Sequence, residues 1–439
     1  MFRRVLPAAF GAGALIGAAL LSPAQAQTAA ILPFTNRTPA PHTAVDAPDS
    51  GPAAATAPAS AERSSVAPGV PDPSAPAAVS NLDWIGESIA ETLRDSLSAR
   101  GILTIGREDT EAAYRRLNLH PRASLSAASV MKIGEAVDAE DVVYGSFEWK
   151  ANAGGGAAAG SLTITARTYD RRHLREGPEF VETGSIDDLA ALEAHLIWRT
   201  LAAVAPKVAP PESDYRTLRP LVRLDAEENY VRGLLAPPDK KEKFFLQATR
   251  LDPRYAHPNF ALGQIHYARK EYREAAEWLQ KIMPGDQHYR EASFLLGLAL
   301  FQSGDYAGAQ NAFQTVASVV PLSEVWNDLG AAQSRKGLPQ ALDSFLKALN
   351  GDPSDPVYHF NTGYALWRKG DFATAAERFR AVLERQPDDQ DATLLLGMCL
   401  KRQGPRAGDS RVENLERLKV NYEERAYWEL RAVLAPEHP

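Results

Sequence analysis

The sequence predicts a small α/β domain followed by an all-α helical-repeat solenoid. Three observations support this fold class. Strand-like and helix-like patterns alternate over residues 27–205, whereas from residue 225 onward the apolar residues have only the helical period. Within that second part, a glycine returns every 33 or 34 positions. A fixed period of this size predicts a stack of equivalent helix pairs.

The first 26 residues have the layout of a secretory signal peptide. Two arginines precede an apolar stretch over residues 5–21, and the small-x-small run AQA follows at 24–26. This pattern predicts export with cleavage after Ala26, and an uncleaved membrane anchor is the alternative. No later run reaches roughly 18 apolar residues. We therefore expect a periplasmic or secreted protein with no integral membrane segment after signal removal.

The α/β domain is predicted over residues 27–205 as a small mixed sheet with helices packed on it. The order is strand, helix, strand, two helices, two or three strands and a closing helix. Between the first strand and the helix at 82–101, the insert 38–80 holds nine prolines and thirteen alanines. Such a segment buries too little apolar surface to offset its ordering entropy, so we expect it to be disordered.

Several of these segments carry a resemblance to a known family. The succession of ILPFTN, LDWIGESIAETLRDSLSARGILTIGREDTEAAYRRL, IGEAVDAEDVVYGSFEW and LTITARTYD resembles the amino-terminal domain of the TolB translocation protein, over about residues 27–205. The insert departs from that pattern, since such domains have a short loop at this place. The resemblance implies a non-enzymatic docking module of the bacterial envelope and transfers no catalytic residue.

The helical part follows one rule in each unit. A glycine sits in the first helix, an alanine and then a phenylalanine or leucine sit in the second, and a proline closes most units. This pattern resembles the tetratricopeptide repeat family over about residues 225–403, after a linker at 206–224. The chain is thus read as an α/β domain followed by a tetratricopeptide helical-repeat solenoid. The repeated glycines are Gly263, Gly297, Gly330, Gly363 and Gly397.

The resemblance also implies a concave surface, lined by the first helix of each pair. This surface is rich in aromatic and amide side chains, which predicts a groove for an extended peptide or a helix. It departs from the Lys/Arg and Asn arrangement that holds a terminal carboxylate in some relatives, so we do not expect that mode of binding. The predicted partner-binding residues are Phe260, Gln264, Tyr267, Phe294, Leu298, Phe301, Asn327, Ala331, Ser334, Phe360, Asn361, Tyr364 and Trp367.

The end of the chain leaves two alternatives for this groove. Residues 412–434 have an amphipathic pattern, which predicts a C-terminal capping helix within 404–439. That helix is a natural occupant of the groove. Binding of an external partner and filling by the protein itself are equally compatible with the sequence.

No motif for catalysis, a cofactor or a metal is found. Glu87, Glu91 and Asp95 are spaced by four residues on one helix face, but without a facing histidine they predict a solvated surface rather than a metal site. His120 and His195 have no partners at metal spacing. The single cysteine, Cys399, lies in an apolar run and is expected to be buried. The net charge of −7 without a basic stripe argues against nucleic-acid binding.

The sequence therefore predicts a secreted or periplasmic, non-enzymatic scaffold. Its groove would bind a protein or peptide partner in the bacterial envelope, and its α/β domain would dock to an envelope component. The alternative is a regulatory subunit that activates a cell-wall or envelope enzyme. A third hypothesis, an enzyme that uses the three acids of the 82–101 helix, is the weakest.

Overall fold

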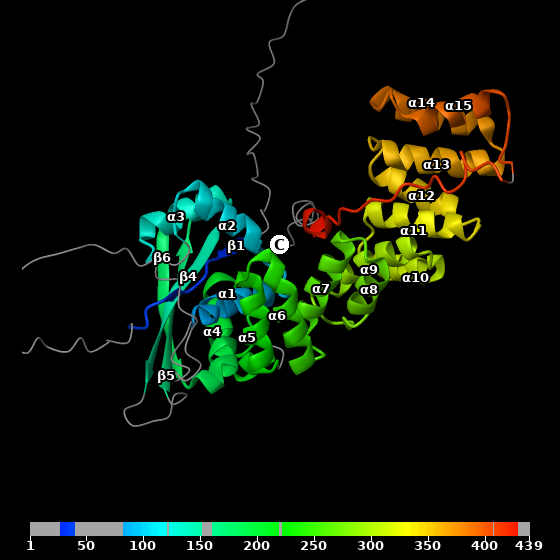
Figure 1. The fold of residues 1–439 in the computed structure, drawn as a ribbon. Helices are drawn as coiled ribbons and strands as arrows, with labels where there is room; N and C mark the ends of the chain where they lie inside the picture. Colours follow the sequence, from blue (N-terminus) through cyan, green and yellow to red (C-terminus); the bar gives the residue numbers. More distant parts are fainter. Residues whose placement is uncertain are drawn as a thin grey trace, which may run out of the picture.

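The protein has a mixed-sheet α/β domain followed by a curved array of helices (Figure 1). The fold class predicted from the sequence is confirmed. The predicted signal peptide and nearly all of the insert lie outside the described residues. The computed structural model describes residues 27–39, 82–120, 123–151, 160–218, 222–406 and 408–428.

The sheet has six strands in the order β3-β1-β4-β5-β6, with β2 pairing beside β1 on β4. Strand β1 is parallel to β3 and β4, whereas β5 is antiparallel to β4 and β6, so the sheet is mixed. The last strand, which the sequence left open, is present as β6. The strands are β1 (Thr28–Ile31), β2 (Thr35–Asn36), β3 (Leu103–Thr104), β4 (Asp141–Ala151), β5 (Gly160–Asp170) and β6 (Arg175–Gly184).

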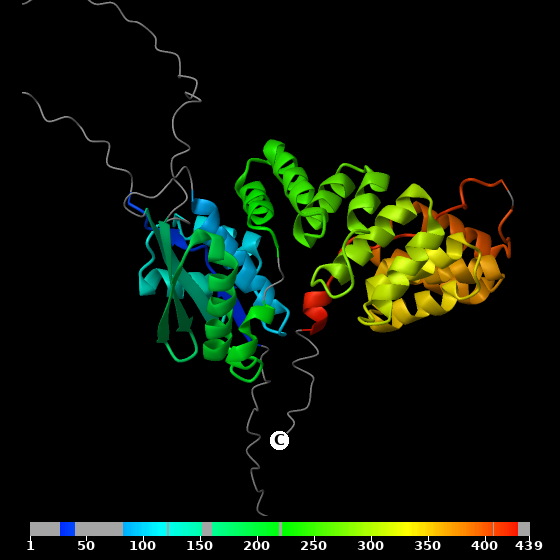
Figure 2. The ribbon, with the colours of Figure 1, turned by 90° about the horizontal axis from the view of Figure 1, so that it is seen from below.

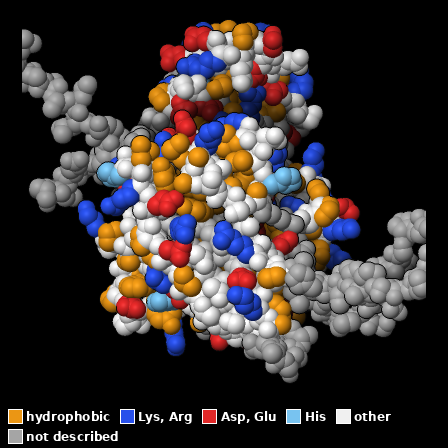
Figure 3. Space-filling view, turned by 90° about the vertical axis from the view of Figure 1, so that its left-hand side faces the viewer, with side chains coloured by type: hydrophobic (Ala, Val, Ile, Leu, Met, Phe, Trp, Pro, Cys, Tyr) orange, Lys and Arg blue, Asp and Glu red, His pale blue; other side chains and the backbone are white. Residues whose placement is uncertain are grey.

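Helices cover both faces of this sheet. On one face, α1 (Asp83–Ser98) and α4 (Leu189–Val204) share an apolar core with inward-facing side chains of β4 and β5. On the other face, α2 (Arg107–Arg116) and α3 (Ala127–Ala136) form a second core. Figure 3 views the molecule from the α/β domain side and shows charges of both signs interspersed on that face.

The array consists of antiparallel helix pairs that pack in sequence order. The predicted linker contains a 3₁₀ segment, Glu212–Leu218, before the first pair. None of the described helices combines the length and the apolar character needed to cross a bilayer. The pairs are α5 (Leu224–Leu235) with α6 (Pro238–Leu251), α7 (Ala256–Ala268) with α8 (Tyr272–Leu279), α9 (Tyr289–Ser303) with α10 (Tyr306–Ala317), α11 (Ser323–Arg335) with α12 (Ala341–Gly351), and α13 (Pro356–Lys369) with α14 (Phe372–Arg385), followed by α15 (Gln390–Leu400).

The periodic glycines are explained by close packing within each pair. A Cβ atom at Gly297 would lie 2.6 Å from the ring of Phe313, and one at Gly330 would lie 2.7 Å from the ring of Phe345. These separations are below van der Waals contact, so only glycine lets the two helices approach this closely. A Cβ at Gly397 would meet no described atom within 4 Å, because α15 has no second helix packed there.

The first helix pair packs onto the α/β domain. Tyr230 of α5 and Phe245 of α6 belong to the same apolar cluster as Ile89 of α1. In this junction the Ser88 hydroxyl donates hydrogen bonds to the carboxylates of Glu193 and Glu227, at 3.0 and 2.7 Å. The α/β domain and the first repeat therefore share one core.

This packing corrects the expectation of a solvated acidic face on α1. Glu87 is buried and pairs with Arg107, at 2.7 Å. Asp95 pairs with His257 of α7. The expectation was wrong because α5 packs against α1, which residue spacing within one helix could not reveal.

The end of the chain also differs from its prediction. Over 404–423, the described residues are not helical, and only 424–428 form a helical turn. The predicted capping helix is therefore wrong over most of its length. The apolar residues Val412, Leu415 and Leu418 still contact the repeats. Side chains of the repeats bond to the backbone here, so a helix is not needed to satisfy it.

Candidate functional site: a concave groove occupied by the chain's own tail

The candidate site is the concave face of α9, α11, α13 and α15, called the groove below. Residues 408–428, called the tail, run along it. They start beside α15 and cross α13 and α11 toward α9, so the tail runs opposite to the order of the repeats (Figures 1 and 2). The groove therefore holds an extended segment of chain in the way it would hold a peptide.

Two buried asparagines hold the backbone of the tail. The Asn361 side chain donates to the carbonyl oxygen of Arg417 at 2.7 Å and accepts from its N–H at 2.9 Å. Asn327 donates to the same carbonyl at 2.8 Å, and Asn361 also donates to Asn327 Oδ1, at 2.8 Å. Both asparagines are completely buried. These bonds recognise a peptide group and are independent of the side chain at that position.

A carboxylate pocket lies next to this backbone clamp. The Glu416 side chain is 1% exposed and pairs with Arg335 at 2.6 Å and with Arg368 at 3.3 Å. The Ser334 hydroxyl donates to the same carboxylate, at 2.6 Å. A buried carboxylate with two cationic partners and a hydroxyl donor is fully paired, which selects an acidic side chain at this position.

The side chain of Arg417 points to an acidic and aromatic site. Its guanidinium lies over the Phe360 ring, 3.4 Å from the centroid, and pairs with Asp389 at 2.5 Å. The hydrogen bond from Arg417 outweighs burial and lowers the pKa of Asp389. A cation stacked on an aromatic ring beside a carboxylate is a specific site for arginine.

The next basic residue meets two aspartates. The Lys419 backbone N–H donates to Asp328 Oδ1 at 2.9 Å, and its ammonium group pairs with Asp355. Asp328 is completely buried, and burial raises its pKa well above the ordinary value in spite of these bonds. Its second oxygen has no hydrogen-bond partner among the described residues. This position therefore holds the tail at an electrostatic cost.

The two ends of the tail are held by aromatic residues. The Tyr422 ring stacks on Phe294, with centroids 5.1 Å apart. Toward the other end, the Tyr364 hydroxyl donates to the carbonyl of Val412 at 2.7 Å. The Trp367 indole donates to the carbonyl of Gln403, just before the tail, at 2.7 Å. The tail is thus anchored along its length.

Most of the sequence-predicted groove residues are brought together here. Asn327, Asn361, Phe294, Phe360 and Tyr364 contact the tail directly. Trp367 contacts the segment before it, and Leu298 and Phe301 belong to a cluster that Leu418 and Tyr422 pack against. The three residues from α7 lie apart: Phe260 stacks on His288, Gln264 is exposed, and Tyr267 contacts Tyr272.

The charged residues of the groove were missed by sequence reasoning. The sequence analysis set aside a clamp built from basic and amide side chains, yet Arg335 and Arg368 stand beside Asn327 and Asn361. They hold an internal glutamate rather than a terminal carboxylate. Their spacing of 33 residues repeats the period of the array, and this signal could have located them.

Comparison with known proteins confirms the repeats. Residues 243–288, 294–356 and 360–409 match the tetratricopeptide repeat family, so this part of the chain consists of such repeats. A comparison with curated proteins found no match. The matched segments begin at residue 243, and nothing in the comparisons supports the resemblance of residues 27–205 to the TolB domain.

Two solved structures illustrate the similarity in fold. One is YrrB, described as a tetratricopeptide protein with an unusual peptide-binding site. It has 20% identity and a TM-score of 0.37, over 40% of this chain and 92% of that chain. The other is residues 41 to the end of MamA from Desulfovibrio magneticus RS-1. It has 21% identity and a TM-score of 0.35, over 39% of this chain and 99% of that chain.

Proposed function

We propose that the protein is a non-enzymatic interaction scaffold whose groove binds an extended segment of a partner protein in exchange for its own tail. The observation that carries the proposal is the pairing of Asn327 and Asn361 with the peptide group of Arg417. Hydrogen bonds to a backbone fit any extended peptide. Tetratricopeptide proteins typically mediate protein–protein contacts, which agrees with this role.

The side-chain contacts of the tail define the partner segment. Arg335 and Arg368 call for a carboxylate at the position of Glu416, and Asp389 calls for a guanidinium at the next position. Asp355 calls for a cation two residues further on, at the position of Lys419. The partner segment would therefore be extended, with an acidic residue followed by basic ones.

The tail sets the threshold that a partner has to exceed. Because the tail is joined to the array by a short connection, its effective concentration at the groove is in the millimolar range. A partner segment with the same contacts would need a higher affinity or a second contact elsewhere on the chain. The α/β domain offers a surface for such a second contact. The proposal thus explains why a docking domain and a groove occur together.

We further propose that this scaffold works in the bacterial envelope, as a periplasmic or secreted protein. The signal-peptide layout of residues 1–26 supports export. The resemblance of the α/β domain to the amino-terminal domain of TolB supports docking to an envelope component. Cell fractionation with and without residues 1–26 tests export, and retention of the shortened chain in the cytoplasm is the expected result.

Exchange of the tail is tested on a chain with a protease site inserted at the 404–408 connection. Cutting keeps every residue of the protein but lets the tail leave on dilution. A labelled peptide with the sequence 408–428 is expected to bind the cut chain and not the uncut one. Fluorescence anisotropy measures the binding.

Variants of the cut chain separate groove binding from other contacts. Asn361→Ala removes the paired backbone bonds and should weaken peptide binding by at least about 10-fold, since a lost buried hydrogen bond costs about 1–3 kcal/mol. Gln264→Ala, an exposed amide on α7, is the matched control and should bind as the unmodified chain does. Equal binding by both variants would overturn the proposal.

A further inference from the structure

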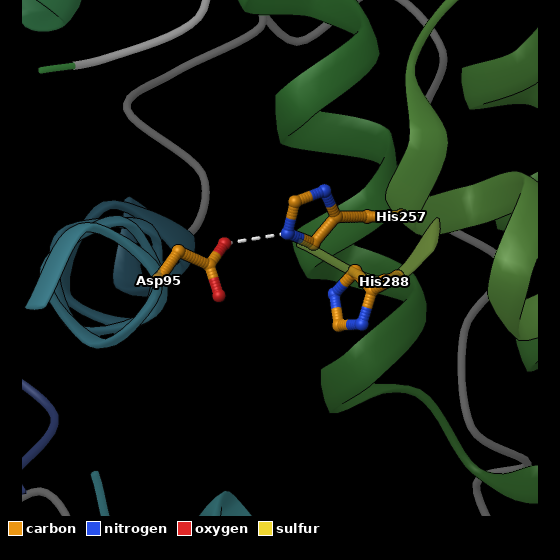
Figure 4. A group of neighbouring side chains, drawn as sticks. All are labelled: Asp95, His257 and His288. Carbon is orange, nitrogen blue, oxygen red and sulfur yellow. Dashed lines mark hydrogen bonds and ion pairs between the residues drawn. The ribbon is translucent and has the colours of Figure 1, made fainter. Parts of the chain in front are cut away.

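A second constellation of side chains lies at the junction between the α/β domain and the repeats. Asp95 comes from α1, His257 from α7, and His288 immediately precedes α9 (Figure 4). One ligand atom from each lies within 4.8 Å of the others. His257 Nε2 is 2.5 Å from Asp95 Oδ2, and the two imidazole centroids are 4.9 Å apart. Three elements far apart in sequence thus point their donors at one place.

The rings are held in position by aromatic packing. Phe260 stacks on the His288 ring at 4.9 Å, with only 15° between the ring planes. Tyr230 and Tyr255 flank His257, with centroids 5.4 and 5.2 Å from its own. Ligands whose orientation is fixed by their neighbours lose little freedom when they bind an ion.

The site is enclosed but not sealed. The side chain of His257 is 15% exposed and that of Asp95 is 26% exposed, so a small ion can reach their donor atoms. A further carboxylate, that of Asp286, accepts a hydrogen bond from the His288 backbone N–H at 2.9 Å. The negative charge of the two aspartates favours a cation between them.

We propose that Asp95, His257 and His288 bind one divalent transition-metal ion of the zinc type, which links the α/β domain to the repeat array. Two imidazole nitrogens and one carboxylate oxygen are a donor set that suits such ions. Water or Asp286 can supply the fourth ligand. The ion would take the place of the proton that joins His257 to Asp95.

An ion pair between Asp95 and His257 explains two of the three side chains without a metal. It does not explain why the His288 imidazole is packed edge-on against His257 with a donor facing the same place. The only hydrogen bond recorded for that ring among the described residues is a 3.4 Å contact with Gln287. Removing the His288 ligand therefore distinguishes a metal site from an ion pair.

The test uses the full chain without a histidine tag, first stripped of metal, and titrates it with Zn²⁺ in a calorimeter. The discriminating variant is His288→Phe, because phenylalanine preserves the stacking on Phe260 and leaves the Asp95–His257 pair intact. The matched control is His266→Ala, which breaks a histidine–carboxylate pair with Glu271 that has no third ligand. Circular dichroism verifies that each variant is folded.

The unmodified chain and His266→Ala are expected to bind one Zn²⁺ per chain. His288→Phe should bind at least about 100-fold more weakly, which is the upper end of what even the loss of an outer-shell partner costs. Zn²⁺ should also raise the unfolding temperature of the first two chains and not of His288→Phe. Absence of stoichiometric binding to the unmodified chain, or equal binding by His288→Phe, would overturn the proposal.

Discussion

The two ends of the repeat array bury their surfaces in different ways. At the amino-terminal end, α5 and α6 join the α/β domain through a continuous apolar core that includes Tyr230, Phe245 and Ile89. At the other end, the groove holds the tail mainly through amide, carboxylate and guanidinium groups. Both surfaces come from the same repeat architecture.

This difference shows which contact is permanent. Burial of apolar surface has no competing ligand in solution, and it gives the junction a fixed geometry. Polar contacts in the groove can be reproduced by any peptide with the same groups, and partly exposed ion pairs contribute little net stability. The junction is therefore a structural joint, and the groove is a site for exchange.

The largest effect is expected from a cavity in the junction. Phe245→Ala should destabilise the chain by about 3–5 kcal/mol, because Phe245 is buried against Tyr230. Hydrogen exchange should then accelerate in α1 and α4 as well as in α5 and α6, since they share one core. Phe313→Ala is the matched cavity on the other side and should accelerate α9 and α10 instead. Unchanged exchange in α1 after Phe245→Ala would break the comparison.

A smaller effect is expected from the carboxylate pocket of the groove. Glu416→Gln leaves Arg335 and Arg368 without their anionic partner. It should weaken tail docking by about 2–3 kcal/mol, below the usual cost of a fully buried pair because Arg368 is partly exposed. Limited proteolysis of the tail measures docking. Asp409→Asn alters a carboxylate that pairs with exposed Arg411 and is the control. Equal proteolysis of the two variants would argue against the pocket.

The groove, unlike the junction, should also loosen in acid. The hydrogen bond from Arg417 lowers the pKa of Asp389, so the pair stabilises docking above the ordinary aspartate pKa of about 3.9. This contribution is lost as the pH falls through the lowered pKa. Arg417→Gln should remove that acid dependence. The difference in tail proteolysis between the two chains, measured from pH 6 to pH 3, should therefore shrink; a constant difference would contradict the assignment.

The smallest effect is expected at Asp328, and it has the opposite sign. Burial raises the pKa of Asp328, so ionisation of this group opposes folding at every pH above about 3.9. Asp328→Asn keeps the acceptor for the Lys419 N–H and removes the charge. We expect a gain below about 1 kcal/mol at pH 7, because the new NH₂ group lacks an acceptor. A lower unfolding temperature for the variant at pH 7 would contradict this.

The repeats could be predicted from sequence because their packing is local. Gly297 and Phe313 are in adjacent helices, and each position repeats after 33 or 34 residues. The groove amides followed from the same period, and so could Arg335 and Arg368 have done.

The tail and the junction could not be predicted in this way. The apolar spacing of Val412, Leu415 and Leu418 fits a helix, and only the distant asparagines explain why an extended chain is as well satisfied. Asp95 and His257 are 162 positions apart, and no local pattern connects them. Contacts between units depend on the orientation of whole elements, which residue spacing does not encode.

Hydrogen exchange of the intact chain tests the central difference most directly. The amide of Arg417, which donates to Asn361, reports on the tail, and amides within α1 and α5 report on the junction. We expect the Arg417 amide to exchange through local opening, much faster than the junction, and to exchange faster still when excess peptide of sequence 408–428 competes for the groove. Exchange of Arg417 as slow as that of α1, unchanged by the peptide, would show that the tail is a permanent part of the fold.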